Sequence, residues 1–325
     1  MNPILVEVVR NDRVESVHRG SVFVADSAGT PVLSAGTPTD LVFPRSANKP
    51  MQALAMLRCG LGSDAELADI DLALATGSHS GEPVHVERVG KMLAAGGYVE
   101  EDLQCPPQLP IDEVAAHAVL AGGGGPSRVL MNCSGKHAAM LLTCRAADWP
   151  IADYLAPTHP LQQEVRRVVA ELADEPVTVT GVDGCGAPLF AITLAGLARC
   201  FARLVAAETG TPERRVADAM RAHPVMVAGS RREDTLLMQS VPGLLMKGGA
   251  EGVHAAALAD GSAITLKIDD GGIRARMPVM VAALRLLGCD ASELDRQASS
   301  AVLGGESAVG VVRLRPGAFP PPLRP

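Results

Sequence analysis

Apolar residues alternate with polar ones near both ends of the chain, and this restricts the fold more than any other feature of the sequence. Residues 3–9 and 20–26 place apolar side chains at about every second position, and residues 31–35 extend the pattern after a turn. Residues 264–268 alternate in the same way, and residues 310–314 form a closing segment of similar character. A period of two is typical of β-strands, which are stable only when they pair. The sequence therefore predicts one antiparallel sheet whose strands come from both termini.

The middle of the chain, from about residue 46 to about residue 241, has mainly the periodicity of helices. We expect helices at about 50–61, 64–76, 83–95, 136–147, 160–173, 188–207, 212–222 and 232–238, a short strand at 176–182 and a last helix at 277–287. Proline in the first turn and glycine near the end support the helix at 50–61. The fold class is thus α/β (α+β), with helices packed on the sheet and a mostly helical region beside it.

The predicted sheet draws on residues from about 1 to 45 and from about 242 to 315. Within it, Asp269-Asp270-Gly271-Gly272 is typical of a hairpin turn, because glycine tolerates positive φ. We expect one catalytic unit over residues 1–315 and a loose tail at 316–325.

Charge and hydropathy exclude several classes of partner. A net charge of -7, a pI near 5.6 and an aromatic content of 2% argue against binding to nucleic acid. No apolar run approaches the roughly 20 residues that span a bilayer, so no membrane segment is expected. Glu7 and Arg10 interrupt the N-terminus before a signal-peptide core can form. A small-molecule ligand or a protein partner remains.

The cysteines indicate the redox compartment. Seven of them, an odd number, are widely spaced at positions 59, 105, 133, 144, 185, 200 and 289. A chain of this length buries a large core and does not need disulfides for stability. Reduced thiols in the cytoplasm are the simplest interpretation, and a disulfide between two of the cysteines is the alternative.

Ser46-Ala47-Asn48-Lys49 is the first motif suited to catalysis. Residues three apart share one side of a helical turn, so the amine of Lys49 can reach the hydroxyl of Ser46. A helix N-terminus and a dry pocket both favour the neutral amine, which can take the serine proton. Pro50 opposes this geometry, because proline disfavours the helical conformation of the residue before it. The alternative is an N-cap serine followed by a surface lysine.

Two other segments contribute a second hydroxyl and a second amine. Ser78 lies in Gly77-Ser78-His79-Ser80-Gly81-Glu82, where glycines let backbone amides approach a substrate, and ordinary helix capping is the alternative. Lys247 begins the segment Lys247-Gly248-Gly249-Ala250-Glu251-Gly252, and a solvated lysine is the alternative there. Lys267 competes with Lys247 as an internal lysine, but the two aspartates that follow it indicate a wet neighbourhood.

Two cysteine-containing segments complete the set. Asn132-Cys133-Ser134-Gly135-Lys136-His137 precedes a predicted helix in the manner of a phosphate-binding loop. Leu130 occupies the place of the first loop glycine and His137 that of the Mg²⁺-ligating hydroxyl, so ATP binding is not expected. Asp183-Gly184-Cys185 ends a predicted strand, where flanking glycine allows close approach to both side chains. A buried thiol is the alternative for Cys185.

The order of an SxxK serine, a loop serine and a late Lys-Gly element resembles the serine β-lactamase and penicillin-binding superfamily. More closely, four segments look like the rhizobial-type L-asparaginases, the asparaginase II family. They are Arg45-Ser46-Ala47-Asn48-Lys49-Pro50, Ser78-His79-Ser80, Asn132-Cys133-Ser134-Gly135-Lys136-His137 and Asp183-Gly184-Cys185. The similarity extends from about residue 5 to about residue 315. It implies a serine β-lactamase-like, glutaminase-like fold and a homodimer.

The resemblance also implies roles for individual residues. Its two catalytic serine–lysine pairs fall on Ser46 with Lys49 and on Ser78 with Lys247. Its zinc site falls on Cys133, Lys136 and Cys185, with Asp183 beside it. Two thiolates and a neutral lysine donate strongly, so this zinc would position the substrate rather than act as the hydrolytic centre. The stretch between the long helix and Lys247 is shorter here than in the family.

These roles imply hydrolysis of L-asparagine to L-aspartate and ammonia. Ser46 would attack the carboxamide carbon after losing its proton to Lys49, and water activated by a lysine would then cleave the acyl-enzyme. Ser78 and Lys247 would relay protons, although the roles of the two serines can be exchanged. The candidates for binding the ammonium and carboxylate groups of the amino-acid substrate are Asp183, Arg45, Asn132 and His137.

Three other functions share parts of this pattern. A β-lactamase-like serine hydrolase uses the same serine–lysine chemistry but gives no reason for Cys133 and Cys185. A glutaminase acts on a substrate one methylene longer, a difference worth only about 1–3 kcal/mol in discrimination. A non-catalytic zinc-dependent binding protein would not need its serines.

Overall fold

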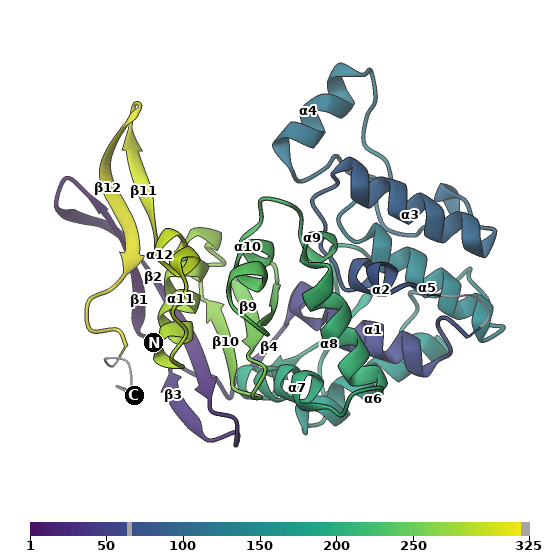
Figure 1. Cartoon of the computed structure of the whole chain (residues 1–325), viewed down its shortest axis with the longest axis horizontal. Coiled ribbons are helices and arrows are strands. Elements are labelled where there is room, and N and C mark those ends of the chain that lie inside the picture. Colours follow the sequence, from purple (N-terminus) through teal and green to yellow (C-terminus); the bar gives the residue numbers. More distant parts are fainter. Residues whose placement is uncertain (64–66, 320–325) are drawn as a thin grey trace. The chain divides into compact units, whose positions relative to one another are not determined.

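The computed structural model describes residues 1–63 and 67–319, and the chain divides into two compact units (Figure 1). Unit 1 comprises Met1–Ala47, Ile192–Ala206 and Leu236–Pro325, and unit 2 comprises Asn48–Ala191 and Ala207–Thr235. The single catalytic unit expected over residues 1–315 stays a prediction. Residues 320–325 of the expected loose tail lie outside the described residues.

Unit 1 is built on an eight-stranded sheet that joins the two ends of the chain (Figure 1). The strands are β1 (Ile4–Arg10), β2 (Arg13–Ala25), β3 (Pro31–Ala35), β8 (Leu245–Gly248), β9 (Val253–Ala257), β10 (Ala263–Ile268), β11 (Ser299–Gly304) and β12 (Ser307–Leu314). Their order is β11-β12-β1-β2-β10-β9-β8, with β3 paired to β2, and every pair is antiparallel. Val8 of β1 is opposite Val312 of β12 on one side and Ser16 of β2 on the other. The predicted sheet with strands from both termini is confirmed.

Helices cover the sheet of unit 1. They are α7 (Leu194–Ala206), α11 (Arg276–Leu286) and α12 (Ser292–Gln297), and α7 packs on β2, β9 and β10. Leu197, Phe201 and Leu204 recur along one face of α7 and are fully buried. Burial of each such side chain stabilises the fold by about 1.5–3 kcal/mol. The Oγ1 atom of Thr265 in β10 donates a hydrogen bond of 2.8 Å to the carbonyl of Leu194, which fixes the start of α7 on the sheet.

Two local predictions are wrong. The helix predicted over 188–207 begins only at Leu194, because the preceding residues form β6 (Pro188–Phe190) and β7 (Ile192–Thr193). Their backbones pair with β5 (Thr180–Val182) and β4 (Leu41–Val42). The turn at Asp269–Gly272 does not close a hairpin. Because β10 already has β9 and β2 as neighbours, the chain continues instead into a 3-10 turn and α11.

Unit 2 is mainly helical. It contains α1 (Lys49–Arg58), α2 (Asp69–Ala75), α3 (Pro83–Gly96), α4 (Glu113–Ala121), α5 (Ser134–Ala146), α6 (Pro160–Ala173), α8 (Pro212–Ala222) and α9 (Pro224–Val227), while α10 (Glu233–Ser240) runs from unit 2 into unit 1. The helix α5 contacts α1, α2 and α3 and is buried along most of its length. Residues 64–66 of the helix predicted over 64–76 lie outside the described residues.

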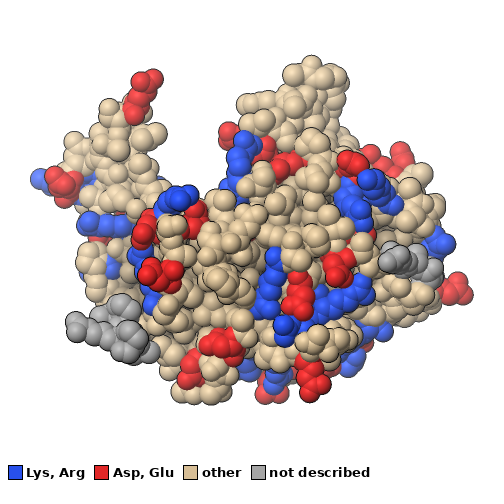
Figure 2. Space-filling model, in the orientation of Figure 1, with Lys and Arg blue, Asp and Glu red and all other residues tan. Residues whose placement is uncertain are grey.

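Acidic and basic side chains are intermixed on the face of the molecule that Figure 2 shows. On α8, Arg214 forms an ion pair with Asp218, and Arg215 pairs with Asp69 of α2. Exposed pairs of this kind contribute about 0–1 kcal/mol each. Across residues 1–63 and 67–319, no helix is long and apolar enough to cross a membrane.

Candidate active site

Lys49 and Ser78 contact each other in unit 2, although the family resemblance places them in different serine–lysine pairs. The Nζ atom of Lys49 donates a hydrogen bond to Oγ of Ser78 at 2.8 Å and another to the carbonyl oxygen of Gly77. A 3-10 turn, Arg45–Asn48, leads directly into α1, so Pro50 lies in the first helical turn, where its missing N–H group costs no hydrogen bond. Lys49 and Ser78 are 1% and 9% exposed, so bulk water is largely excluded from the pair.

The loop after α2 holds Ser78 through contacts with the segment around α9. The N–H group of Ser78 donates to the carbonyl of Val227 at 2.8 Å, and the hydroxyl of Ser80 donates to that of Ala228 at 2.8 Å. A Cβ atom on Gly77 would lie 2.6 Å from the carbonyl oxygen of Met226. This close approach requires glycine immediately before Ser78.

His79 joins the loop of Ser78 to the segment before α5. Its N–H group donates to the carbonyl of Asn132 at 3.0 Å, and its ring Nδ1 accepts the N–H group of Gly81 at 3.2 Å. Nε2 therefore carries the ring proton and donates it to Oγ of Ser134, 2.9 Å away. Burial lowers the pKa of His79 well below its usual value, so the ring is neutral at physiological pH.

Cys133, Lys136 and Cys185 form a second cluster in unit 2. Cys133 and Lys136 lie at the start of α5, Cys185 lies in the loop between β5 and β6, and Nζ of Lys136 is 3.0 Å from Sγ of Cys185. A hydrogen bond from Cys133 lowers the pKa of Cys185, and the charge of Lys136 assists. Burial alone would lower the pKa of Lys136, but the two sulfur atoms raise it above its usual value. The lowered pKa of Cys185 and the raised pKa of Lys136 both favour a thiolate paired with an ammonium group.

Asn132 and Asp183, two predicted substrate-binding residues, flank this cluster. The Sγ atom of Cys133 lies 3.0 Å from Oδ1 of Asn132, and that of Cys185 lies 3.8 Å from Oδ2 of Asp183. Four segments that are distant in the sequence, those of Lys49, Ser78, Asn132 and Asp183, therefore contribute to unit 2.

His137, another predicted substrate-binding residue, contacts Tyr154. No motif in the sequence indicates Tyr154. The N–H group of Gln104 donates to the Tyr154 oxygen at 2.9 Å, and that oxygen lies 2.8 Å from Nδ1 of His137. Because the Tyr154 oxygen already accepts from Gln104, its own hydrogen is available to Nδ1. Burial lowers the pKa of His137, and the adjacent sulfur of Cys185 opposes this effect. The only signal for Tyr154 in the sequence is that the chain has just 2 tyrosines.

The cysteine cluster offers two sulfur atoms, which are donors that suit zinc. The amine of Lys136 could join them only after losing its proton, because the sulfur atoms raise its pKa. All seven cysteines have free thiols. Within the described ranges, no group of three or more His, Cys, Asp and Glu side chains is arranged to hold a metal ion. The cysteine cluster differs from such a group by its lysine.

The charge of Lys49 connects the two clusters. The hydrogen bond with Cys185 raises the pKa of Cys133, and the positive charge of Lys49 opposes that rise. Lys49 is therefore within electrostatic range of Cys133 while it is in contact with Ser78. The lysine–serine contact and the cysteine cluster thus lie within electrostatic range of each other in unit 2.

The remaining predicted residues lie in unit 1. Lys247 is on β8, is 1% exposed, and donates from Nζ to the carbonyl of Gly248 at 2.7 Å. Arg45 has a left-handed φ of 50°, and its guanidinium lies 3.9 Å from the carboxylate of Glu251, whose φ is 57°. Ser46 is part of the 3-10 turn before α1. The two serine–lysine pairs expected from the resemblance, and their convergence in one pocket, stay predictions.

A family model described as L-asparaginase II matches residues 6–314. The chain belongs to the L-asparaginase II family. It is accordingly an amidohydrolase, and the resemblance expected from about residue 5 to about residue 315 is confirmed. No curated protein matches the chain.

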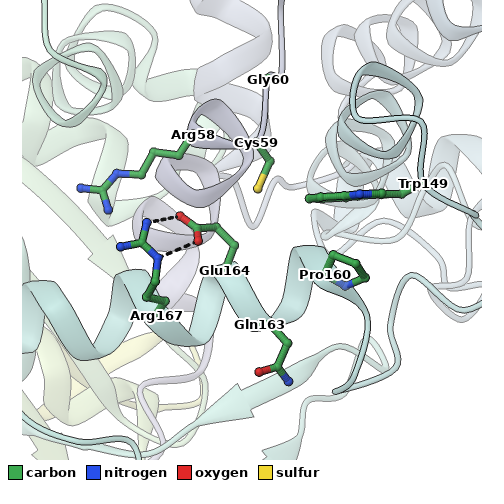
Figure 3. Close-up of a pocket in the computed structure, with 8 residues that line it drawn as sticks. All are labelled: Arg58, Cys59, Gly60, Trp149, Pro160, Gln163, Glu164 and Arg167. Carbon is green, nitrogen blue, oxygen red and sulfur yellow. Dashed lines mark hydrogen bonds and ion pairs between the residues drawn. The ribbon is translucent and has the colours of Figure 1, made fainter.

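A separate hollow of unit 2 contains none of the residues expected to act in an L-asparaginase II enzyme (Figure 3). Its volume is about 1070 Å³, and it is lined by Arg58, Cys59, Gly60, Trp149, Pro160, Gln163, Glu164 and Arg167. Arg58 ends the helix that Lys49 begins, about 13 Å further along its axis. Arg167 is paired with Glu164, and Arg58 with Glu171. None of the side chains that line the hollow is among those expected to act, so we assign it no role in the reaction.

Proposed function

We propose that this amidohydrolase converts L-asparagine to L-aspartate and ammonia through an acyl-enzyme on Ser46. The hydrogen bond between Lys49 and Ser78 supports this proposal most directly, because it joins an amine and a hydroxyl where little water reaches. Membership of the L-asparaginase II family supplies the substrate class.

In this mechanism Lys49 is the base, and it must first lose the proton that makes it an ammonium group. A neutral lysine amine has two N–H groups and one lone pair. Lys49 gives its N–H groups to the carbonyl of Gly77 and to Oγ of Ser78. Its lone pair then accepts the proton of Ser46, three residues earlier in the chain, as Ser46 attacks the carboxamide carbon.

Ser78 carries the proton to the leaving group. Its oxygen accepts from Lys49, so its own hydrogen can pass to the departing nitrogen, which leaves as ammonia while Lys49 returns a proton to Ser78. Water then loses a proton to a lysine amine and attacks the ester carbon, and the bond to Ser46 breaks to release L-aspartate. Ser46 regains the proton from that lysine, with Lys247 assisting the relay. Well-placed acid–base groups contribute about 10²–10⁴-fold to such reactions.

Cys133, Lys136 and Cys185 are the proposed zinc ligands. A zinc ion bound there would supply a positive charge that orients the substrate through an open coordination position. Cys185 is already a thiolate, whereas Cys133 and Lys136 would each have to lose a proton.

The α-amino and α-carboxylate groups of the substrate need partners of opposite charge. We assign Asp183 to the ammonium and Arg45 to the carboxylate, with Asn132 and His137 beside the cysteine cluster. The family resemblance supports a homodimer, and the seven free thiols support a reducing compartment such as the cytoplasm. Light scattering of the purified protein measures the oligomeric state.

Ammonia release tests the proposal. The wild type should release ammonia from L-asparagine faster than from L-glutamine or D-asparagine. Ser46→Ala and Ser78→Ala should lose this activity, and Ser240→Ala, which changes an exposed serine of α10, should keep it. Acid-quenched wild type should carry an aspartyl ester on the peptide that contains Ser46. An ester on Ser78 would exchange the serine roles, and a wild type inactive on all three amides would refute the function.

A further inference from the structure

The first turn of α1 presents three buried polar side chains. Asn48 and Gln52 are four residues apart and Lys49 and Gln52 are three apart, so all three lie toward one side of the helix. Asn48 and Lys49 are each 1% exposed, and Gln52 is 4% exposed. Lys49 uses this position to contact Ser78, but the side chain of Asn48 does not cap the helix that it precedes.

Three polar atoms on this face have no protein partner. Among the residues that the structure describes, Nδ2 and Oδ1 of Asn48 and Oε1 of Gln52 are buried without a hydrogen bond. Buried polar groups in folded proteins are nearly always paired, and an unpaired one destabilises the fold. A ligand that displaces the groups packed against these atoms would supply the missing partners.

The unpaired atoms define the chemistry of that ligand. They comprise one donor, Nδ2 of Asn48, and two acceptors, Oδ1 of Asn48 and Oε1 of Gln52. A primary carboxamide has the complementary set, with one carbonyl oxygen and two N–H groups.

We propose that Asn48 and Gln52 form the recognition site for the carboxamide of the substrate. Asn48 donates to the carboxamide oxygen, while Asn48 and Gln52 accept its two N–H groups. This inference rests on the proposed function, which brings a carboxamide to Lys49.

The same atoms discriminate against the product. L-aspartate has a carboxylate where L-asparagine has a carboxamide, so it has no N–H group for the two acceptor oxygens and turns its own lone pairs toward them. The site therefore holds L-asparagine more tightly than L-aspartate at this position, which favours release of the product once the amide is cleaved.

Binding is best measured without turnover, in a Ser46→Ala/Ser78→Ala parent. Adding Asn48→Leu removes the donor and the acceptor at similar size. Calorimetry should show about 10- to 100-fold weaker binding of L-asparagine and unchanged binding of L-aspartate. The unfolding temperature should stay equal or rise, because two unpaired buried atoms are gone. Asn48→Asp, which exchanges the donor for an acceptor, should also weaken binding of L-asparagine.

Thr143→Val is the matched control. The hydroxyl of Thr143 is fully buried in α5 but has a partner, the carbonyl of Ala139 at 2.7 Å. This variant should lower the unfolding temperature and leave L-asparagine binding unchanged.

The inference is overturned if the Asn48→Leu variant is destabilised as much as Thr143→Val and still binds L-asparagine as tightly as its parent. Failure of the parent to bind L-asparagine overturns it too. If Asn48→Leu does not fold, Asn48→Asp decides, with unchanged L-asparagine binding counting against the site. The two proposals can also fail separately. If the wild type releases no ammonia but the parent prefers L-asparagine to L-aspartate and Asn48→Leu abolishes this preference, the proposed function is wrong and the carboxamide site remains.

Discussion

The Nζ atom of Lys136 lies 3.0 Å from Sγ of Cys185, and both side chains are 1% exposed. The pKa of Cys185 is lowered, chiefly by the hydrogen bond from Cys133, and that of Lys136 is raised by the two sulfur atoms against the effect of burial. The start of α5 is therefore joined to the loop between β5 and β6 by a buried ion pair, whose loss has consequences for both stability and metal binding.

In the metal-free protein, Lys136→Met should lower the free energy of unfolding by about 3–5 kcal/mol, because it leaves the Cys185 thiolate buried without its cation. Urea unfolding measures the change. Lys91→Met breaks an exposed ion pair with Glu87 on α3 and should cost less than about 1 kcal/mol. Equal losses in the two variants would contradict the buried pair.

Cys133→Ser should reduce the zinc content of protein purified without chelator, because it removes one of three proposed donors. Cys144→Ser changes a buried cysteine further along α5 and should keep the zinc content of the wild type. Mass spectrometry of the metal gives the stoichiometry. Because the pKa of Cys133 is raised, zinc should also bind more weakly as the pH falls, which a chelator competition measures. Wild type without zinc, or Cys133→Ser with a full complement, would refute the site.

Lys49→Met should lower kcat for L-asparagine by about 10²–10⁴-fold, since it removes the base and the hydrogen bond to Ser78. Steady-state ammonia release measures kcat and KM. Lys267→Met is the control, because Lys267 is the competing internal lysine. Loss of activity in Lys267→Met together with an active Lys49→Met would reverse the assignment of the base.

Acid should destabilise the fold through His79 and His85, whose rings stack at 5.1 Å. Burial lowers the pKa of both in the folded protein. The unfolded chain takes up these protons as the pH falls through about 6.5, whereas the folded protein does so only at lower pH. These two protons should thus decrease the free energy of unfolding below about pH 6.5 by up to about 2.7 kcal/mol per pH unit. His137, whose pKa burial also lowers, adds to this decrease.

Urea unfolding between about pH 7.5 and about pH 5.5 measures this slope. His85→Phe keeps a ring against His79 but removes one titrating group, so its slope should be smaller than that of the wild type, while His79 and His137 still contribute. A free energy of unfolding that does not change over this range would contradict the neutral, buried state of the two histidines.

Elements with local signals were predictable from the sequence. The helices at 160–173 and 212–222 begin and end where predicted, because proline marks each first turn and the apolar stripe defines the length. The helix predicted at 188–207 failed at its start because pairing with β4 and β5, which no local pattern reports, outweighs helical periodicity there. The turn at Asp269–Gly272 failed similarly, since the neighbours of β10 come from distant parts of the chain.

The residues of the candidate site could be proposed from the sequence, but the contacts between them could not. Motif order and the resemblance to the asparaginase II family together predicted Lys49, Ser78 and the cysteine cluster. They could not indicate that Lys49 contacts Ser78, because that hydrogen bond depends on how the loop after α2 packs. The contact of Tyr154 with His137 and the unpaired amide of Asn48 could not be predicted from the sequence for the same reason, because hydrogen-bond partners follow from tertiary structure.

The place of β1 between β12 and β2 also bears on how the protein is made. During synthesis β1 can pair with β2 as soon as both strands have left the ribosome. The other edge of β1 stays unpaired until Ser307–Leu314 has also left it. Until then an open strand edge is exposed, of the kind that promotes aggregation. Unit 2, by contrast, has most of its residues in the continuous stretch Asn48–Ala191 and can begin to fold on the ribosome long before the sheet of unit 1 is complete.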